Sequence, residues 1–594
     1  MKENVILLVI DSLSFERLSG KYHSTPFLTS LMNKSVSCEK MFAQAPFTEA
    51  AVMGLIAGCR TMDFGGYIKR FADIPKTLPE VFAERGYEVY QYIQPHIYPT
   101  SLERNVPFSY YNVGFDFQAL WGYRLKYYQE LYKKDGLQKR DYQLIIEILK
   151  DNFIGWKLFL KRLIHHDDKV SLIADNLREY PVEEILSKVI SEEKSFVFDP
   201  QAYIMQLFFE GEKHVLFQIT TLNQEKKIRN PLIKEAFIEK YKPLFQRIYQ
   251  VDRQFGISFD REVIRNIKNM CKSFLLHPEK EKLKDIIRFK RYIQQRTQES
   301  NIMERIASNY DAYKNAPSFQ SHLNHFYQWL DEKRDTSKPF FGYIHVDDIH
   351  NPEVFFTYDS YDLKLLDDEM QDVINFLDKL GDGYHGSITY DLGLQYIDKK
   401  IASMFDYLEK IKMLENTTIY IAADHGFSFY NVPLRETVPN NFYCESYHVP
   451  FIAYNSGYQS KRIKEFHQTM DIPATILSQA GIAIPEHFVG KDIFKNEQVN
   501  NYVTVEYMGG GCPDIWRRPV RYGIRNQHYN LVYYAKLTQD FSEGRLEQLF
   551  DLSADPLEQN NLVYSKKVRN NSEVAELLDI LARRHAEIRE TMKP

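Results

Sequence analysis

Cysteine and tryptophan are scarce in this 594-residue chain, which holds 5 Cys and 4 Trp. The cysteines are widely spaced and include no Cys-x-x-Cys pair, which argues against a zinc ribbon or a disulfide framework. No apolar run reaches the roughly 18 residues that a transmembrane helix needs. The apolar run near the N-terminus ends at Asp11 and is too short for the core of a signal peptide, so we expect a cytoplasmic location.

Neither sign of charge dominates the sequence. The chain carries 75 Lys and Arg against 80 Asp and Glu, for a formal net charge of −5. This balance argues against a protein that coats nucleic acid, so we expect no nucleic-acid partner. The hydrophobic fraction of 44% and the charged fraction of 26% exclude a disordered or fibrous chain. Tyr and Phe are abundant instead, at 41 and 40 residues.

Strands and helices alternate in two separate parts of the chain. Residues 5–10, 340–345 and 418–423 are short apolar runs typical of buried parallel strands. Residues 48–58 and 390–414 have the spacing of helices that bury one face. This alternation predicts an α/β fold with a mostly parallel central sheet.

The character of the sequence changes between these two parts. Residues 116–335 are poor in Gly and Pro and rich in Lys, Glu, Leu, Tyr and Phe, which predicts a large helical insertion. We therefore expect a discontinuous α/β core formed by residues 1–115 and 336–499. Residues 500–594 contain a hairpin pattern and a closing helical pattern, which predict a small C-terminal α+β subdomain.

Several polar side chains follow the predicted strands at the point where each strand ends. They are Asp11, His345, His350, Asp424 and His425. Ligands of open α/β sheets bind outside the carboxyl ends of the strands, so we expect these groups near one site. Carboxylates and imidazoles together can bind a divalent metal.

Thr48 lies at the expected N-terminus of a helix, where unpaired backbone N–H groups favour an anion. A metal near its hydroxyl would lower the hydroxyl pKa and create a nucleophile at neutral pH. Each residue also has an ordinary interpretation. Thr48 and Asp11 could be helix caps, Asp424 and His425 could belong to a plain turn, and the other histidines could be structural.

The motifs, taken in their order along the chain, resemble the sulfatase-like branch of the alkaline phosphatase superfamily. The resemblance covers more than half of the chain and fails in the helical insertion. It implies an alkaline-phosphatase-like α/β sandwich. The matching stretches are residues 4–13, 43–58, 86–96, 341–350, 396–426, 448–450, 471–482 and 549–556.

The resemblance implies a role for each matching polar residue. Asp11, Thr48, Asp424 and His425 would bind a metal, and Thr48 would also be the nucleophile. His350 would contact the substrate ester or its leaving group. The substrate-binding side would be formed by the following residues: Gln94, His96, His345 and His448.

The sequence departs from the usual sulfatase pattern around Thr48. Formylglycine sulfatases have Cys or Ser followed by x-Pro-x-Arg, whereas Thr48 here is followed by Glu-Ala-Ala-Val. Ser12 replaces a second acidic ligand, and Gln94 replaces a lysine of the anion site. A threonine nucleophile instead resembles the phosphodiesterases and phosphoglycerol or phosphoethanolamine transferases of the superfamily.

We therefore predict a metal-dependent hydrolase or transferase that acts on a phosphate diester through a phosphorylated Thr48. One alternative is a sulfatase that cleaves a sulfate ester without formylglycine. A second alternative is a non-catalytic binding protein on a degenerate hydrolase fold. Under the first two readings the cofactor is one divalent ion, Mn²⁺, Zn²⁺, Mg²⁺ or Ca²⁺, and the substrate is an anionic ester linked to a glycan or lipid. The helical insertion could also support a homo-oligomer.

Overall fold

The central β-sheet of the computed structural model has eight strands in the order β4-β3-β5-β1-β6-β7-β2-β8. Strand β1 (Asn4–Ile10) lies between β5 (Phe340–Val346) and β6 (Thr417–Ala422) and runs parallel to both. These three strands are almost wholly apolar, as burial on both faces requires. The structure describes residues 3–18, 24–65, 75–93, 109–110, 123–165, 181–216, 319–350, 388–427, 442–495, 501–509, 516 and 518–591, with 243, 246, 247, 375 and 378 singly.

The outer strands complete a sheet in which β7 alone opposes its neighbours among the described strands. Strand β7 pairs antiparallel with β6 and β2, whereas the β2–β8, β3–β5 and β3–β4 pairs are parallel. The prediction of an α/β fold with a mostly parallel sheet is therefore confirmed. The bounds of these strands are β2 (Val36–Phe42), β3 (Glu88–Ile93), β4 (Ser109–Tyr110), β7 (His448–Tyr454) and β8 (Lys461–Gln468).

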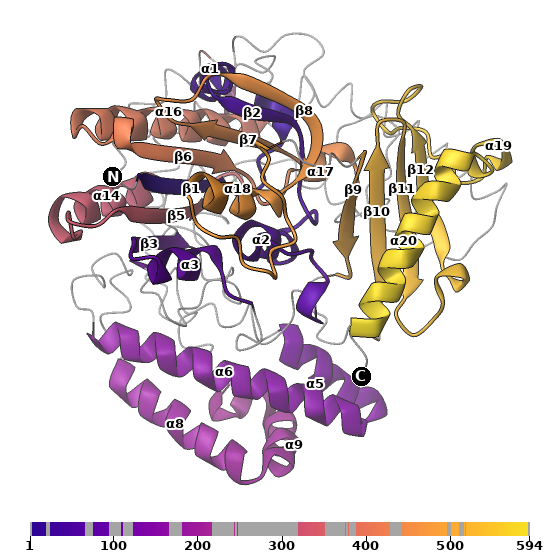
Figure 1. Ribbon diagram of the computed structural model, residues 1–594. Coiled ribbons are helices and arrows are strands. Elements are labelled where there is room, and N and C mark those ends of the chain that lie inside the picture. Colours follow the sequence, from indigo (N-terminus) through magenta and orange to yellow (C-terminus); the bar gives the residue numbers. More distant parts are fainter. Residues whose placement is uncertain are drawn as a thin grey trace.

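Two groups of helices pack beside the sheet (Figure 1). In one group α1 and α14 contact α16, and in the other α2 contacts α3 and α18. Helix α2 ends at Gly58, whose φ of 59° is the left-handed conformation that glycine adopts without strain. The helix bounds are α1 (Pro26–Lys34), α2 (Thr48–Ala57), α3 (Leu78–Glu84), α14 (Phe319–Gln328), α16 (Ile388–Lys410), α17 (Cys444–Tyr447) and α18 (Asp471–Gln479).

The predicted insertion forms a helical layer with an apolar core of its own. Figure 1 shows these helices in purple, set apart from the sheet. Aromatic rings fill the layer's core: Phe153 packs against Trp156, Phe196 and Tyr203. Some of the abundant Tyr and Phe are thus core residues of this second layer, and more of them lie in the core of the main sheet. Its described helices are α5 (Tyr123–Asp135), α6 (Lys139–His165), α8 (Val182–Phe198) and α9 (Pro200–Glu210).

The boundary expected at residue 335 for the helical insertion does not match the packing of α14, which lies before that residue. Phe319, Leu323 and Phe326 of α14 belong to the core of the main sheet, not to that of the insertion. Their buried spacing of three to four residues is an ordinary helical pattern, so sequence alone could not tell which core they join. The helical stretches expected near residues 233–249 and 281–298 fall almost entirely outside the described part of the chain.

The C-terminal part forms a four-stranded antiparallel sheet in the order β12-β11-β10-β9. The expected hairpin is β10 (Pro519–Asn526) and β11 (Tyr529–Lys536), flanked by β9 (Tyr502–Tyr507) and β12 (Arg545–Asp551). The closing helix is α20 (Ser572–Thr591), which packs against this sheet in Figure 1, with α19 (Lys566–Arg569) before it. Sequence patterning recovered the hairpin and the helix but not the two outer strands.

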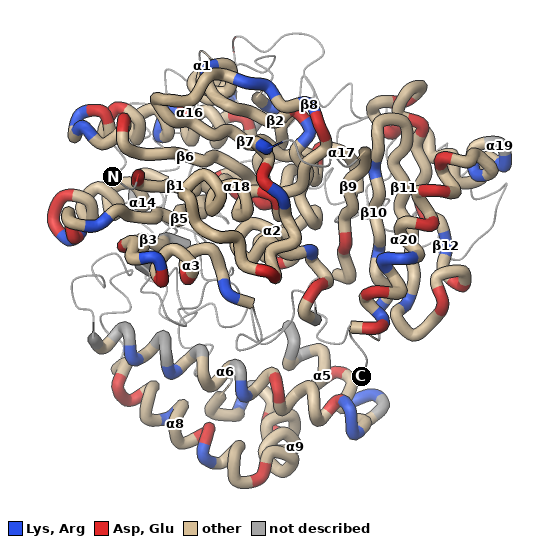
Figure 2. Tube along the Cα trace, in the orientation of Figure 1, with Lys and Arg blue, Asp and Glu red and all other residues tan. Residues whose placement is uncertain are grey.

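Acidic and basic residues are mixed along the described chain and are not sorted by sign, as Figure 2 shows. Among the described helices, none is both long and apolar enough to cross a membrane.

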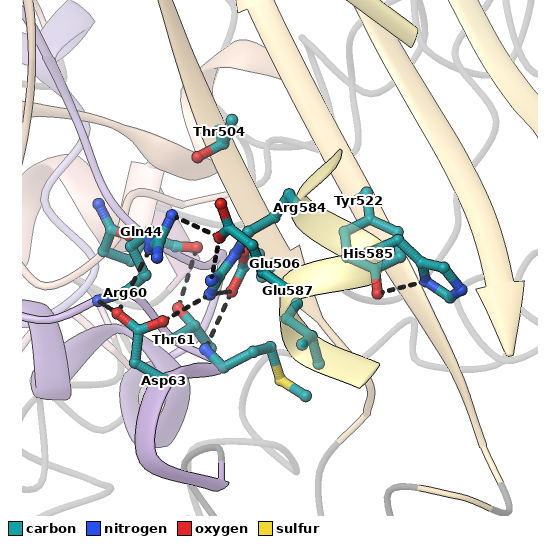
Figure 3. A network of polar contacts seen from close by, with 12 residues as sticks. Gln44, Arg60, Thr61, Asp63, Thr504, Glu506, Tyr522, Arg584, His585 and Glu587 are labelled. Atoms are coloured by element: carbon teal, nitrogen blue, oxygen red, sulfur yellow. Dashed lines mark hydrogen bonds and ion pairs between the residues drawn. The ribbon is translucent and has the colours of Figure 1, made fainter. Parts of the chain in front are cut away.

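A buried ion-pair network joins the C-terminal subdomain to the segment that follows α2 (Figure 3). Arg584 of α20 pairs with Glu506 of β9 and, at 2.9 Å, with Asp63. The Glu506 carboxylate also accepts a 2.9 Å hydrogen bond from the backbone N–H of Met62. The hydroxyl of Thr61 donates to backbone carbonyls on both sides of the start of α2. Helix α20 therefore supports the segment that follows α2.

We expect Arg584→Met to lower the free energy of unfolding by about 3 kcal/mol or more, because it leaves the buried Glu506 carboxylate without its partner. Arg589→Met is the matched control, since Arg589 pairs with a largely exposed Asp540 on the same helix. Arg589→Met should change the free energy of unfolding by no more than about 0.5 kcal/mol. Urea unfolding followed by circular dichroism measures both, and equal midpoints would contradict the prediction.

Candidate metal centre

Three neighbouring parallel strands deliver polar side chains to one edge of the central sheet. Asp11 follows β1, His345 lies near the end of β5, and Asp424 follows β6 closely. The backbone N–H of Asp11 donates to Val346 O at 2.8 Å, which continues the β1–β5 pairing up to the site. The prediction that strand ends bring these residues together is confirmed by this geometry.

The two carboxylates are fully buried, with Asp11 and Asp424 each 0% exposed. Burial, together with the charge of Asp11, raises the pKa of Asp424 well above its ordinary range. Oδ1 of Asp424 accepts hydrogen bonds from the backbone N–H groups of Ser12 at 3.2 Å and His425 at 2.7 Å. Its Oδ2 makes no hydrogen bond to the described residues. Two buried anions this close together need a positive charge beside them.

His425 completes one side of the centre. Its Nε2 lies 3.4 Å from Asp11 Oδ1 and 3.7 Å from Asp424 Oδ2. Its Nδ1 is 2.7 Å from the carbonyl of Gly426, so the proton on Nδ1 leaves the lone pair of Nε2 directed at the carboxylates. A side chain on Gly426 would place its Cβ 1.9 Å from the Glu445 carbonyl oxygen. The Asp-His-Gly sequence is thus required by close packing as well as by ligand chemistry.

Thr48 is the first residue of α2 and is almost fully buried. Its hydroxyl donates to Asp11 Oδ2 at 3.1 Å and lies 3.2 Å from His425 Nε2. The helix N-terminus supplies unpaired backbone N–H groups and a favourable dipole for a bound oxyanion. The hydroxyl of Thr48, the predicted nucleophile, therefore lies beside two of the predicted metal ligands, Asp11 and His425.

Two further histidines lie on opposite sides of Asp11. His345 is 0% exposed, and its Nε2 is 3.9 Å from both Asp11 Oδ2 and Asp424 Oδ2. His350 is exposed, and its ring centre is 6.1 Å from that of His425. Each joins a group of potential ligands within 4.8 Å of one another: Asp11, His345 and Asp424, or Asp11, His350 and His425.

His448 lies apart from this cluster. Its ring stacks between Phe15 and Phe42, and its Nε2 donates to the Glu39 carbonyl at 2.8 Å. Burial lowers its pKa to about 4 and keeps it neutral. None of its contacts within the described chain is with Asp11 or Thr48, so this geometry gives no support to the predicted substrate contact. The predicted Gln94 and His96 fall outside the described residues.

Sequence reasoning missed the residues that shape the turn after β1. Ser12 has a φ of 65°, and its hydroxyl donates to Asp11 Oδ1 at 2.8 Å. The Tyr390 hydroxyl donates to the Ser12 carbonyl at 2.8 Å and accepts from the Ser14 N–H at 3.2 Å. A positive φ at a serine leaves no sequence signal, and Tyr390 is distant along the chain, so only the fold reveals both.

The donor set suits a divalent cation. Two buried carboxylates, an Asp424 oxygen that makes no hydrogen bond to described residues, and an oriented imidazole nitrogen converge on one place. A bound cation would offset the repulsion between the carboxylates. It would also polarise an ester oxygen and acidify the Thr48 hydroxyl.

A family model described as "Sulfatase" matches residues 3–163 and 268–482, and a second, "N-sulphoglucosamine sulphohydrolase, C-terminal", matches 440–587. The chain belongs to the sulfatase family. It is 28% identical over 268 residues to an arylsulfatase of Clostridium perfringens, a match that covers 40% of this chain and 52% of the relative. It is 27% identical over 210 residues to an N-acetylglucosamine-6-O-sulfatase of Bacteroides thetaiotaomicron, covering 31% and 33%.

The matches to these curated relatives span about half of their length or less. Among solved structures, a phosphonate monoester hydrolase of Agrobacterium radiobacter superposes with a TM-score of 0.49 at 12% identity, covering 98% of this chain and 96% of that one. So distant a likeness says nothing about the reaction, and the fold assignment rests on the strand order and the family match.

The prediction of a phosphate-diester substrate is wrong. The curated relatives matched by the chain are named for sulfate esters, including arylsulfatases and sulfatases of glycans. The prediction rested on departures from the formylglycine sulfatase pattern: the threonine at position 48 without the following Pro and Arg, Ser12, and Gln94. A hydroxyl beside a cation does not by itself select phosphorus over sulfur, because both esters present tetrahedral oxyanions of similar shape. These few positions therefore carried too much weight against the whole ordered series.

We expect Asp424→Asn to lower the affinity for a divalent cation by at least about tenfold, because the amide keeps the backbone hydrogen bonds but loses the charge. Asp398→Asn is the matched control, since Asp398 is also buried and accepts two backbone N–H bonds, from Phe27 and Leu28. Elemental analysis after equilibrium dialysis measures bound metal. Full metal occupancy in Asp424→Asn would contradict the centre described above.

Proposed function

We propose that this protein is a metal-dependent hydrolase of sulfate esters that works without formylglycine. The observation that carries the proposal is the position of the Thr48 hydroxyl at the start of α2, 3.1 Å from Asp11 and 3.2 Å from His425. Membership of the sulfatase family and the sulfate-ester names of the relatives support the substrate class. The relatives named for glycan sulfates favour a sulfated saccharide as substrate.

Thr48 holds the nucleophilic oxygen in this proposal. Its proton leaves along the hydrogen bond to Asp11 as Oγ1 attacks sulfur, and the bond from sulfur to the organic oxygen breaks. His350, on the exposed side, donates a proton to the departing alkoxide. The backbone N–H groups at the start of α2 stabilise the sulfuryl oxygens. A divalent cation, when bound, would acidify the hydroxyl and polarise the ester.

Release of sulfate differs here from that of a formylglycine enzyme. A threonine ester of sulfate has no second hydroxyl on its carbon, so it cannot eliminate sulfate to leave an aldehyde. Water must attack sulfur, and the bond from sulfur to Thr48 Oγ1 breaks. Oγ1 takes back the proton that Asp11 received in the first step, which restores the threonine, and hydrogen sulfate leaves. His350, deprotonated in the first step, accepts the proton of that water. Overall, one sulfate ester and one water give one alcohol and one hydrogen sulfate.

We expect Thr48→Ala to lower kcat by at least about 10³-fold on p-nitrophenyl sulfate or a sulfated glucosamine, while bound metal stays unchanged. Thr48→Ser keeps the hydroxyl and should retain a substantial part of the activity. Mass spectrometry of quenched wild-type protein should find a sulfuryl group on the peptide that contains Thr48.

Bis-p-nitrophenyl phosphate serves as the comparison substrate. Cleavage of this diester without cleavage of any sulfate ester would contradict the proposal. Full activity in Thr48→Ala would contradict the role of the threonine, and metal binding without turnover of any sulfate would favour a non-catalytic member of the family. The cytoplasmic location and self-association through the insertion stay predictions, which fractionation and sedimentation would test.

A further inference from the structure

His345 is 0% exposed and belongs to β5, where it pairs in register with Val9 of β1. Its side chain lies on a central strand with parallel neighbours on both sides. The contact with substrate expected from sequence stays a prediction, whereas the structure places the imidazole close to the buried carboxylates of Asp11 and Asp424.

The distances from His345 identify the kind of interaction. Its Nε2 is 3.9 Å from Asp11 Oδ2 and also 3.9 Å from Asp424 Oδ2. These separations are too long for hydrogen bonds, which a charged imidazole would form at about 2.8 Å. Ligand atoms that each lie about 2.1 Å from one cation are separated by roughly 3.0–4.2 Å. The two separations from His345 Nε2 fall in this range, and the ligand atoms of all three residues lie within 4.8 Å of one another.

The orientation of the ring is set by its other nitrogen. Nδ1 of His345 lies 3.2 Å from the hydroxyl oxygen of Tyr343 on the same strand. The Tyr343 oxygen can accept a hydrogen bond from an N–H at Nδ1, which holds the ring in place. Metal-binding histidines are commonly oriented in this way, with Nε2 left to bind the ion.

We propose that His345 is a metal ligand that completes a buried site with Asp11 and Asp424. One imidazole nitrogen and two carboxylate oxygens suit a borderline ion of the Zn²⁺ type. They suit Ca²⁺ poorly, because Ca²⁺ takes six to eight oxygen ligands. With His425 Nε2 beside the same carboxylates, His345 adds a second imidazole nitrogen, which favours nitrogen-binding divalent ions at the strand ends.

Titration of metal-free protein with Zn²⁺, and with Co²⁺ as a coloured probe, tests the proposal under chelator competition. His345→Gln should weaken metal binding by more than about 100-fold. Loss of a residue that only hydrogen-bonds to a metal ligand typically weakens binding by about 10- to 100-fold. His345→Gln should also change the visible spectrum of the Co²⁺ form. His585→Gln is the matched control, because His585 is 1% exposed and its Nδ1 also contacts a tyrosine hydroxyl, that of Tyr522. The control should bind as the wild type does.

X-ray absorption at the zinc edge tests the same point without altering His345. In a His350→Gln background, which removes the exposed imidazole, we expect the spectrum to retain histidine scattering and to lose part of it when His345 is also changed. An unchanged spectrum, or a smaller loss of affinity in His345→Gln, would overturn the proposal. These measurements use no substrate, so their failure is distinct from a failure of the sulfate-ester proposal.

Discussion

The repulsion between two buried carboxylates governs this structure. Asp11 and Asp424 end neighbouring parallel strands and are both 0% exposed, so their charges cannot be solvated. The other groups of the centre lie where they can stabilise these two charges. Backbone N–H groups satisfy one oxygen of Asp424, a positive φ at Ser12 directs one of them, and two imidazole nitrogens face the carboxylates. A divalent cation would offset the repulsion between the carboxylates. Because Thr48 lies beside them, the same cation would acidify its hydroxyl.

Much of the fold could be predicted because its sequence signals are local. Strand β1 is a continuous apolar run that ends at a carboxylate, and α2 has small apolar residues and a glycine at its end. The edge strands were missed because their burial alternates and their partners lie far along the chain. Strand β8, for example, pairs with β2 through residues that are charged and exposed at its start.

The candidate site was predicted in outline and not in detail. The carboxyl ends of parallel strands meet at one edge, so Asp11, Asp424 and His425 could be brought together by argument alone. The burial of His345 and the exposure of His350 could not, because they depend on where β5 ends and on what packs over each residue. The prediction of the substrate failed for another reason: it was inferred from departures at a few positions, chiefly Thr48, whose hydroxyl serves either kind of ester.

The ion-pair network around Arg584 has a consequence for how the protein is made. Helix α2 precedes β9, which carries the carboxylate that holds the segment after α2, and it precedes α20, which carries the arginine that neutralises this carboxylate. The support of this segment is therefore complete only after the insertion and the second sheet have been synthesised. Such contacts between distant segments slow folding and favour assembly after translation over assembly in step with it.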